Sequence, residues 1–151
     1  MNELLYGIIL SILPISELRL GIPVAMSSNT PLIIIFLACV IANILIIPII
    51  FLFLDFLHHR FLKIKAYEKL FSKLIIRTRK KMEHHVGTKW EMPALFLLVA
   101  IPLPGTGAYT GVFAAWLFNL KRKKAFTAIA LGVILAGILI TLASLGIYNL
   151  I

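Results

Sequence analysis

The chain has 151 residues, of which 61% are hydrophobic and 14% are charged, and its mean hydropathy is +1.03. Soluble globular domains carry about 45–50% apolar and about 25% charged residues, so the composition excludes that class. Because one membrane crossing takes about 20 apolar residues, the chain is long enough for one small membrane domain and no more.

The net charge of +9 comes from lysines and arginines that, Arg19 aside, lie in two stretches, 60–89 and 121–124. Basic loops beside apolar segments mark the cytoplasmic side of a membrane protein, which explains the charge without nucleic acid. Within the first stretch, Phe61 to Arg77 has the periodicity of an amphipathic helix with a basic face. Such a helix would bind anionic lipid head groups, although a plain basic connector explains the same charges.

The first apolar region, 4–27, is expected to form a re-entrant helical hairpin, because the segment from Pro14 to Pro23 interrupts it. Proline removes a backbone donor and glycine is a poor helix former, which favours two half-helices over one straight span. The region has no basic start and no small-residue cleavage motif, so we do not interpret it as a cleaved signal peptide.

Four further segments follow in chain order. Residues 31–57 are apolar and long enough to span a membrane, and residues 58–91 form the basic linker. Residues 92–120 are interrupted at Pro102-Leu103-Pro104-Gly105-Thr106-Gly107, which predicts a second re-entrant hairpin. Residues 125–151 carry no charged side chain and predict a second spanning helix.

The positions of the basic stretches predict the topology. Both should lie in the cytoplasm, so residues 92–120 must enter and leave the membrane on the same side. The helix at 31–57 then runs inward, the helix at 125–151 runs outward, and both termini lie outside. We expect a multi-pass protein of the inner or plasma membrane, with the linker in the cytoplasm.

The two halves of the chain resemble each other at an offset of 90 residues. This offset places hairpin on hairpin and spanning helix on spanning helix, and it aligns Pro14 with Pro104, Gly21 with Gly111, Phe36 with Phe126 and Ala38 with Ala128. We therefore predict an all-α membrane fold of two inverted-topology repeats, an architecture that many secondary transporters share. Irregular backbone at membrane depth needs protein or water partners, so two facing hairpins imply a polar cavity near the midplane.

Glu17 and Arg19 lie inside the first hairpin, where a charge costs about 2.5–3.5 kcal/mol on insertion scales. Two positions apart, they point to different sides of a helix. Burial disfavours an ionised carboxylate, whereas Arg19 and a helix N-terminus favour it, so Glu17 is the candidate proton carrier. The alternative is a structural pair in which the two charges only neutralise each other.

The two interruptions also contain hydroxyl residues at positions where helices should begin. Ser16 and Thr106 are each placed to cap the half-helix that follows. Two helix N-termini would then face one cavity and, with Arg19, form an anion site. The candidate substrate- and proton-binding residues are Glu17, Arg19, Ser16, Gly21, Pro104, Gly105, Thr106, Gly107 and Tyr109.

The sequence favours neither an enzyme nor a metal or cofactor site. His58–His59 and His84–His85 are adjacent pairs that cannot face one ion on a helix, and Cys39, expected in the core, has no partner cysteine. Small residues recur at every fourth position of the spanning segments, which permits close packing within the chain or in a homodimer. They are Ala38 and Ala42 in the first half and Ala128, Gly132 and Ala136 in the second.

The motifs from Pro14 to Pro23 and from Pro102 to Gly111 resemble the prokaryotic family of small multi-drug export proteins over nearly the whole chain. That family looks like a compact relative of the DedA (SNARE-associated, VTT-domain) membrane proteins. The resemblance implies two opposed re-entrant hairpins, a link to proton-dependent lipid flipping or scrambling, and a role for Glu17 as the acidic residue of the first hairpin. The arginine of the second DedA hairpin has no counterpart in 102–120, and Arg19 is the candidate to replace it.

These expectations lead to a DedA-like transporter that moves an anionic lipid or other amphipathic anion across the bilayer, with proton coupling. One alternative is a small exporter of lipophilic cations, which would use Glu17 as its membrane carboxylate. A second is a membrane protein that organises lipids or partners without transporting anything. Membrane lipids are the expected partners, and nucleic acid is not.

Overall fold

The computed structural model describes residues 2–56, 72–73, 76, 80, 84, 86–103 and 105–148. This part of the chain forms six α-helices and contains no strand, which confirms the all-helical fold class. Three expectations fall wholly or mostly outside the described residues: the amphipathic helix at 61–77, the histidine pairs and the position of Pro104.

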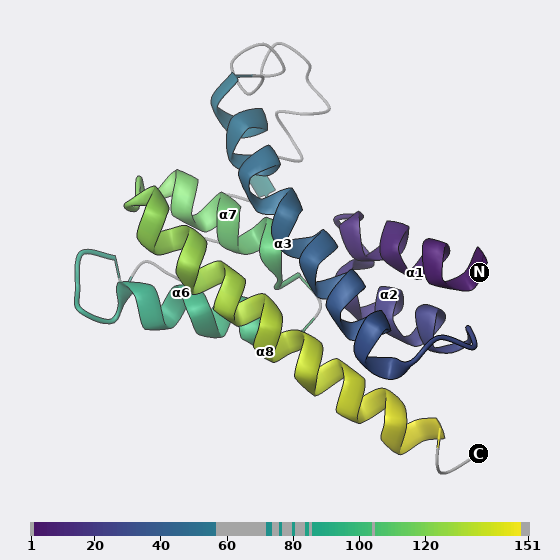
Figure 1. Cartoon of the computed structure of the whole chain (residues 1–151). Helices are drawn as coiled ribbons and strands as arrows, with labels where there is room; N and C mark the ends of the chain where they lie inside the picture. The colour runs from purple at the N-terminus through teal and green to yellow at the C-terminus, as the bar shows by residue number, and fades with distance from the viewer. Residues whose placement is uncertain are drawn as a thin grey trace.

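The helices follow the order short, short, long in each half of the chain (Figure 1). The first half contains α1 (Asn2–Ile12), α2 (Glu17–Met26) and α3 (Leu32–Phe56). The second half contains α6 (Glu91–Ala100), α7 (Ala108–Leu117) and α8 (Arg122–Tyr148). The long helices begin at Leu32 and Arg122, which is the offset of 90 residues that aligns the two halves of the sequence.

Each pair of short helices is joined by an irregular segment, which we call turn 1 (13–16) and turn 2 (101–107). Turn 1 is shorter than the expected interruption, because Pro23 lies inside α2 instead of ending it. Proline at this position removes only the N–H that would bond to the Arg19 carbonyl, and the helix continues through it. In Figure 1 the two helix pairs extend away from their turns in opposite directions.

The long helices α3 and α8 are apolar enough to cross a membrane. At about 1.5 Å per residue they exceed the thickness of a hydrocarbon core of about 30 Å. One face of α3 exposes a large aliphatic side chain in nearly every turn, and about half or more of each of these side chains is accessible: Ile33, Leu37, Ile41, Leu45, Ile49 and Leu52. A continuous exposed apolar stripe of this length fits contact with lipid chains.

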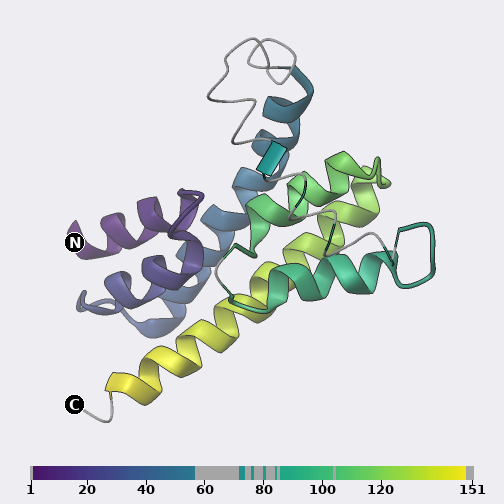
Figure 2. The same ribbon diagram turned by 180° about the vertical axis from the view of Figure 1, so that it is seen from behind.

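The two long helices cross in opposite directions (Figures 1 and 2). The end of α3 meets the start of α8, where Arg122 forms an ion pair of 2.6 Å with Asp55. Trp116 at the end of α7 donates its indole N–H to the same carboxylate at 3.2 Å. In both views the beginning of α1 and the end of α8 lie on the same side of the molecule.

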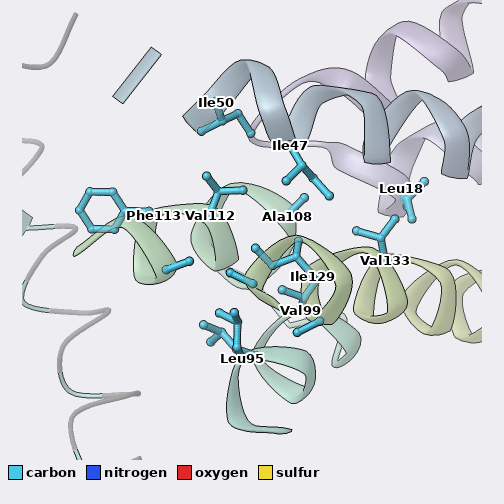
Figure 3. Packing of buried hydrophobic residues seen from close by; sticks show 14 of the residues in the cluster. Leu18, Ile47, Ile50, Leu95, Val99, Ala108, Val112, Phe113, Ile129 and Val133 are labelled. Carbon is cyan, nitrogen blue, oxygen red and sulfur yellow. The ribbon is translucent and has the colours of Figure 1, made fainter. Parts of the chain in front are cut away.

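The core lies where α2, α3, α6, α7 and α8 meet, and Figure 3 shows its close packing. Its fully buried members include Ile22, Ile47, Leu95, Val112 and Ile129. The free Cys39 is buried in the same core, as expected. A Cβ at Gly132 would collide with Val99 and with the Phe96 carbonyl, so this small residue of α8 serves packing within the chain.

The two helix pairs pack differently. Gly7 of α1 and Gly21 of α2 touch each other so closely that a Cβ on either would collide with the other helix. The position equivalent to Gly7 in the second half is Leu97, which is half exposed and lines a surface groove. The helices α1 and α2 therefore pack mainly on each other, whereas α6 packs mainly on α8.

Candidate functional site

The two turns meet at the centre of the molecule and enclose an open pocket of about 290 Å³. Turn 1 contributes a proline and an isoleucine that is 94% exposed, so the pocket is accessible from outside. The complete lining is Pro14, Ile15, Glu17, Arg19, Gly105, Thr106 and Thr110. We call this the polar pocket, because it contains both charged side chains of the first hairpin.

Arg19 reaches from α2 across the pocket to turn 2. Its Nη2 donates hydrogen bonds to the hydroxyl of Thr106 at 3.2 Å and to the Thr106 carbonyl at 3.3 Å. The guanidinium group has five N–H donors, and the two bonds to Thr106 both come from one of its three nitrogens. Arg19 therefore retains donors that a ligand in the polar pocket can use.

Glu17 begins α2 with an unusual backbone conformation. Its φ of 44° lies in the left-handed region, which costs a residue with a side chain about 1–2 kcal/mol. Its carboxylate accepts the Tyr109 N–H at 3.4 Å, at the N-terminus of α7. Gly107 lies directly beneath this carboxylate, because a Cβ at Gly107 would overlap with it. The unfavourable backbone thus places the carboxylate on the second helix pair.

Among the ion pairs of the described residues, none joins the Glu17 carboxylate to the Arg19 guanidinium. Each side chain instead crosses to a different residue of the second helix pair. The N-terminus of α7, which we expected to remain open for a substrate anion, is met by Glu17 itself. What the pocket offers a ligand is therefore Arg19 beside a carboxylate, and not two bare helix N-termini.

The expected capping roles of Ser16 and Thr106 are wrong. Neither α2 nor α7 has a side-chain cap, and the N-cap position of α7 is Gly107. Both hydroxyls point backward and bond to carbonyl groups at the end of the preceding helix. Ser16 donates to the Leu10 carbonyl at 2.6 Å, and Thr106 contacts the Ile101 carbonyl at 2.6 Å. The last carbonyls of a helix have no partner within it. The hydroxyls of Ser16 and Thr106 therefore bond to the C-terminal end of the preceding helix instead of capping the N-terminus of the next one.

The last carbonyls of α1 accept hydrogen bonds from side chains of other parts of the chain. The three consecutive carbonyls of residues 10–12 each accept a hydrogen bond from a different side chain. Ser16 of turn 1 bonds to the first, Asn43 of α3 to the second at 2.6 Å, and the Tyr109 hydroxyl of α7 to the third at 2.5 Å. Tyr109 therefore ties the second helix pair to the first, and the end of α1 is held by turn 1, α3 and α7.

The remaining predicted residues are divided between the pocket and the packing. Gly105 lines the polar pocket with a φ of 80°, so glycine suits the turn. Gly21 lies away from the pocket, in the α1–α2 contact beside Ser11. Our sequence reasoning missed Thr110 and Asn43. Asn43 could have been found, because it is a lone amide within the otherwise apolar segment 32–54.

An apolar groove of about 380 Å³ runs along α6 and ends at the polar pocket. Trp90 lines it at the start of α6, and Thr106 belongs to both the groove and the pocket. The intervening lining is Pro93, Ala94, Leu97, Leu98, Ile101 and Leu103. A long apolar surface and a charged pocket are thus continuous.

Searches of curated proteins and of solved structures returned no match. A family model described as "Putative small multi-drug export protein" matches residues 17–139. The match begins at Glu17, directly after turn 1, and includes turn 2, the five pocket residues from Glu17 onward, all of α3 and most of α8. With its two apolar spanning helices, the chain is a membrane protein, and it belongs to this family of small multi-drug export proteins.

Proposed function

We propose that the protein transports an amphipathic anion across the membrane, with the anionic head group bound by Arg19 in the polar pocket. The observation that supports this most directly is the pocket itself, which places a guanidinium group with remaining donors beside a carboxylate at the meeting point of two turns. Arginine binds phosphate and carboxylate groups well, because its planar fork matches their oxygen atoms. A lipid with a phosphate head group is the substrate class that this chemistry favours.

The groove along α6 supports an amphipathic substrate. It is lined almost entirely by apolar side chains, and it joins the polar pocket at Thr106. A molecule with its head group at Arg19 would have an apolar path for its chain from Thr106 toward Trp90. A small hydrophilic anion would leave this groove empty.

The repeated helix order supports a transport mechanism of the DedA type. We propose that α1–α2 and α6–α7 are re-entrant hairpins that enter the membrane from opposite sides, and that α3 and α8 span it. The opposite directions of the two helix pairs in Figure 1 and the antiparallel long helices fit this arrangement. Inverted repeats of this kind bind substrates near the midplane, where their irregular segments meet.

Glu17 would couple the transport to protons. The carboxylate lies between the polar pocket and the buried interior, because it lines both the pocket and a second cavity behind it. Protonation would weaken its bond to the N-terminus of α7, since the helix dipole favours the charged form. Release of that contact is the proposed link between protonation and movement of the second helix pair.

The family description favours a second candidate, an exporter of lipophilic cations. In that case Glu17 would bind the cation, and Arg19 would oppose binding by charge repulsion. Removal of Arg19 therefore has opposite effects in the two cases, and this difference provides the test.

The experiment is transport in liposomes that contain the purified protein, with a fluorescent phosphate lipid as the first substrate and a lipophilic fluorescent cation as the second. For an anion transporter we expect Arg19→Ala to lower phosphate-lipid transport about tenfold or more, because a hydrogen bond to a charged group is lost. Arg122→Ala removes an arginine outside the pocket and should leave transport unchanged. Cation transport that survives or improves in Arg19→Ala would establish the exporter. If the wild-type protein moves neither substrate, the organising role would replace both proposals.

A further inference from the structure

Asn43 has a buried oxygen atom with no hydrogen-bond partner. The side chain is 1% exposed, and its Nδ2 donates to the Ser11 carbonyl at 2.6 Å. A carbonyl can only accept, so this contact fixes which end of the amide faces Ser11. Oδ1 is left on the other side, and it has no donor among the described residues. Burial of an unpaired acceptor costs about 1–3 kcal/mol, which calls for an explanation.

The space near this amide is a small cavity that Asn43 shares with Glu17 and Arg19. Its volume is about 10 Å³, about the size that one water molecule requires. The wall contributed by α8 is apolar and consists of Val133, Ala136 and Ile140. With polar partners on one side and an apolar wall on the other, a cavity of this volume has room for one small polar molecule.

The cavity lies where the two halves of the chain meet. Three pairs of its lining residues are 90 positions apart: Glu17 and Gly107, Leu18 and Ala108, Asn43 and Val133. In two of these pairs the first half supplies a polar side chain and the second half an apolar residue. The polar pocket lies on the other side of Glu17 and Arg19, since both residues line both spaces. Glu17 is therefore accessible from two directions.

We infer that this cavity holds one ordered water molecule that bridges Asn43 Oδ1 and the Glu17 carboxylate, and that Asn43 is a positioning residue for the Glu17 proton. The inference extends the proposed function, because it gives the proton carrier a second partner behind the pocket. Water has two O–H donors, which match two acceptors. When Glu17 takes up a proton, its O–H donates to the same water molecule, which continues to donate to Asn43.

The other groups that face Glu17 fit water better than a cation. Arg19 from its own helix carries a positive charge, and Tyr109 from α7 contributes its backbone N–H. The elements packed behind Glu17 offer the amide of Asn43 from α3 and aliphatic side chains from α8, none of which titrates. A sodium ion would lie beside a guanidinium group with a single neutral side-chain ligand, and this arrangement is unfavourable.

The test is infrared difference spectroscopy of the full-length protein in lipid, recorded as the pH is lowered. Glu17→Gln identifies the C=O band of protonated Glu17, and exchange into H₂¹⁸O identifies O–H bands of ordered water. In the wild type we expect a water band that changes together with the Glu17 band. Asn43→Leu should remove the water band and move the Glu17 band to a higher frequency, because the acid loses a hydrogen-bond partner. Thr141→Val removes a buried hydroxyl elsewhere on α8 and should change neither band.

A second variant separates the water from the Asn43–Ser11 contact. Ala136→Val fills the cavity from α8 and leaves Asn43 in place, so it should also remove the water band even if Asn43→Leu fails to fold. A water band that persists in Ala136→Val, or a Glu17 band that shifts with sodium while no H₂¹⁸O-sensitive band changes with it, would overturn the inference. The spectra need no substrate, so a failure of transport in liposomes does not affect this result.

Discussion

Arg19 donates hydrogen bonds to both the hydroxyl and the carbonyl oxygen of Thr106, which lies 87 positions later in the chain. The guanidinium group of Arg19, which belongs to the first helix pair, is therefore held by turn 2 in the second helix pair. Any ligand that binds Arg19 in the polar pocket must compete with turn 2 or share the guanidinium group with it. In the proposed function, substrate binding at Arg19 would therefore be coupled to the position of the second helix pair.

Thr106→Val should loosen turn 2 and free Arg19. The hydroxyl accepts from Arg19 and from the Leu103 N–H, and it donates within the turn. We expect a loss of about 1–3 kcal/mol in the free energy of unfolding, because Arg19 and the Leu103 N–H each lose a hydrogen-bond acceptor. Unfolding in mixed detergent micelles measures the change. Thr106→Ser retains the hydroxyl and should be close to the wild type, and equal losses in both variants would contradict this account.

Gly107→Ala should disrupt the site more than any other glycine substitution in turn 2. The new Cβ would overlap with the Glu17 carboxylate, and the φ of 130° does not suit alanine. We expect a destabilisation of about 2–4 kcal/mol and a loss of transport. Gly105→Ala is the matched control, because it has a positive φ but no atom within 4 Å of the new Cβ. It should cost about 1–2 kcal/mol, and similar effects of the two substitutions would show that overlap with Glu17 is unimportant.

Glu17→Gly should give a more stable protein than Glu17→Ala. Both substitutions remove the carboxylate, but only glycine adopts the φ of 44° without cost. The expected difference between the two variants is about 1 kcal/mol in the free energy of unfolding. A helix interior gives the opposite order, so Gly146 of α8 is the comparison: Gly146→Ala should stabilise the protein. Glycine that is no better than alanine at position 17 would exclude the left-handed backbone.

Glu17→Gln should fold and insert normally and should abolish any dependence of transport on pH. Glutamine has the shape of the protonated acid, and its carbonyl oxygen can still accept the Tyr109 N–H. Transport rates of wild type and variant across a range of pH measure the effect. If the variant fails to fold, the negative charge of Glu17 has a structural role in balancing the nearby Arg19, since a buried charge left alone costs about 3–5 kcal/mol. Unchanged transport and unchanged pH dependence would sink both accounts.

The topology can be tested by cysteine labelling in a variant that lacks Cys39. We expect cysteines introduced at Ser28 and Ile151 to react with an impermeant reagent from outside, and a cysteine at Lys124 to react only after the cells are opened. The ion pair between Asp55 and Arg122 already places the end of α3 beside the start of α8. An inward-facing Met1 would mean that the first region crosses the membrane once, which would remove the inverted repeat.

Much of the fold could be predicted from sequence, because prolines, glycines and the lengths of apolar segments act locally. The break near Pro14 and the two long helices are examples. The sequence also indicated that Glu17 and Arg19 belong with turn 2, since a charge in an apolar region needs partners. The sequence could assign those partners only to a region and not to particular residues, because each partner lies about 90 residues away in the chain.

The predictions that were wrong depend on the direction in which a residue points in the folded protein. Ser16 and Thr106 have the right residue type for a cap, but each hydroxyl also lies within reach of the preceding helix end, and those carbonyls compete for it. Gly21 was predicted to belong to the site, yet it faces α1. No local pattern reveals that Glu17 has a positive φ, because this conformation follows from the packing of its carboxylate on the second helix pair.

The contact between Glu17 and Gly107 also limits how such a protein can arise by gene duplication. The two residues occupy equivalent positions, and there is no room for a Cβ at the second one. Two identical polypeptides could not assemble this arrangement, because glutamate at both positions would collide and glycine at both would leave no acid. In a chain that arose by duplication, one copy would have to keep the carboxylate while the other lost its side chain. The site therefore requires the two halves to differ at this position.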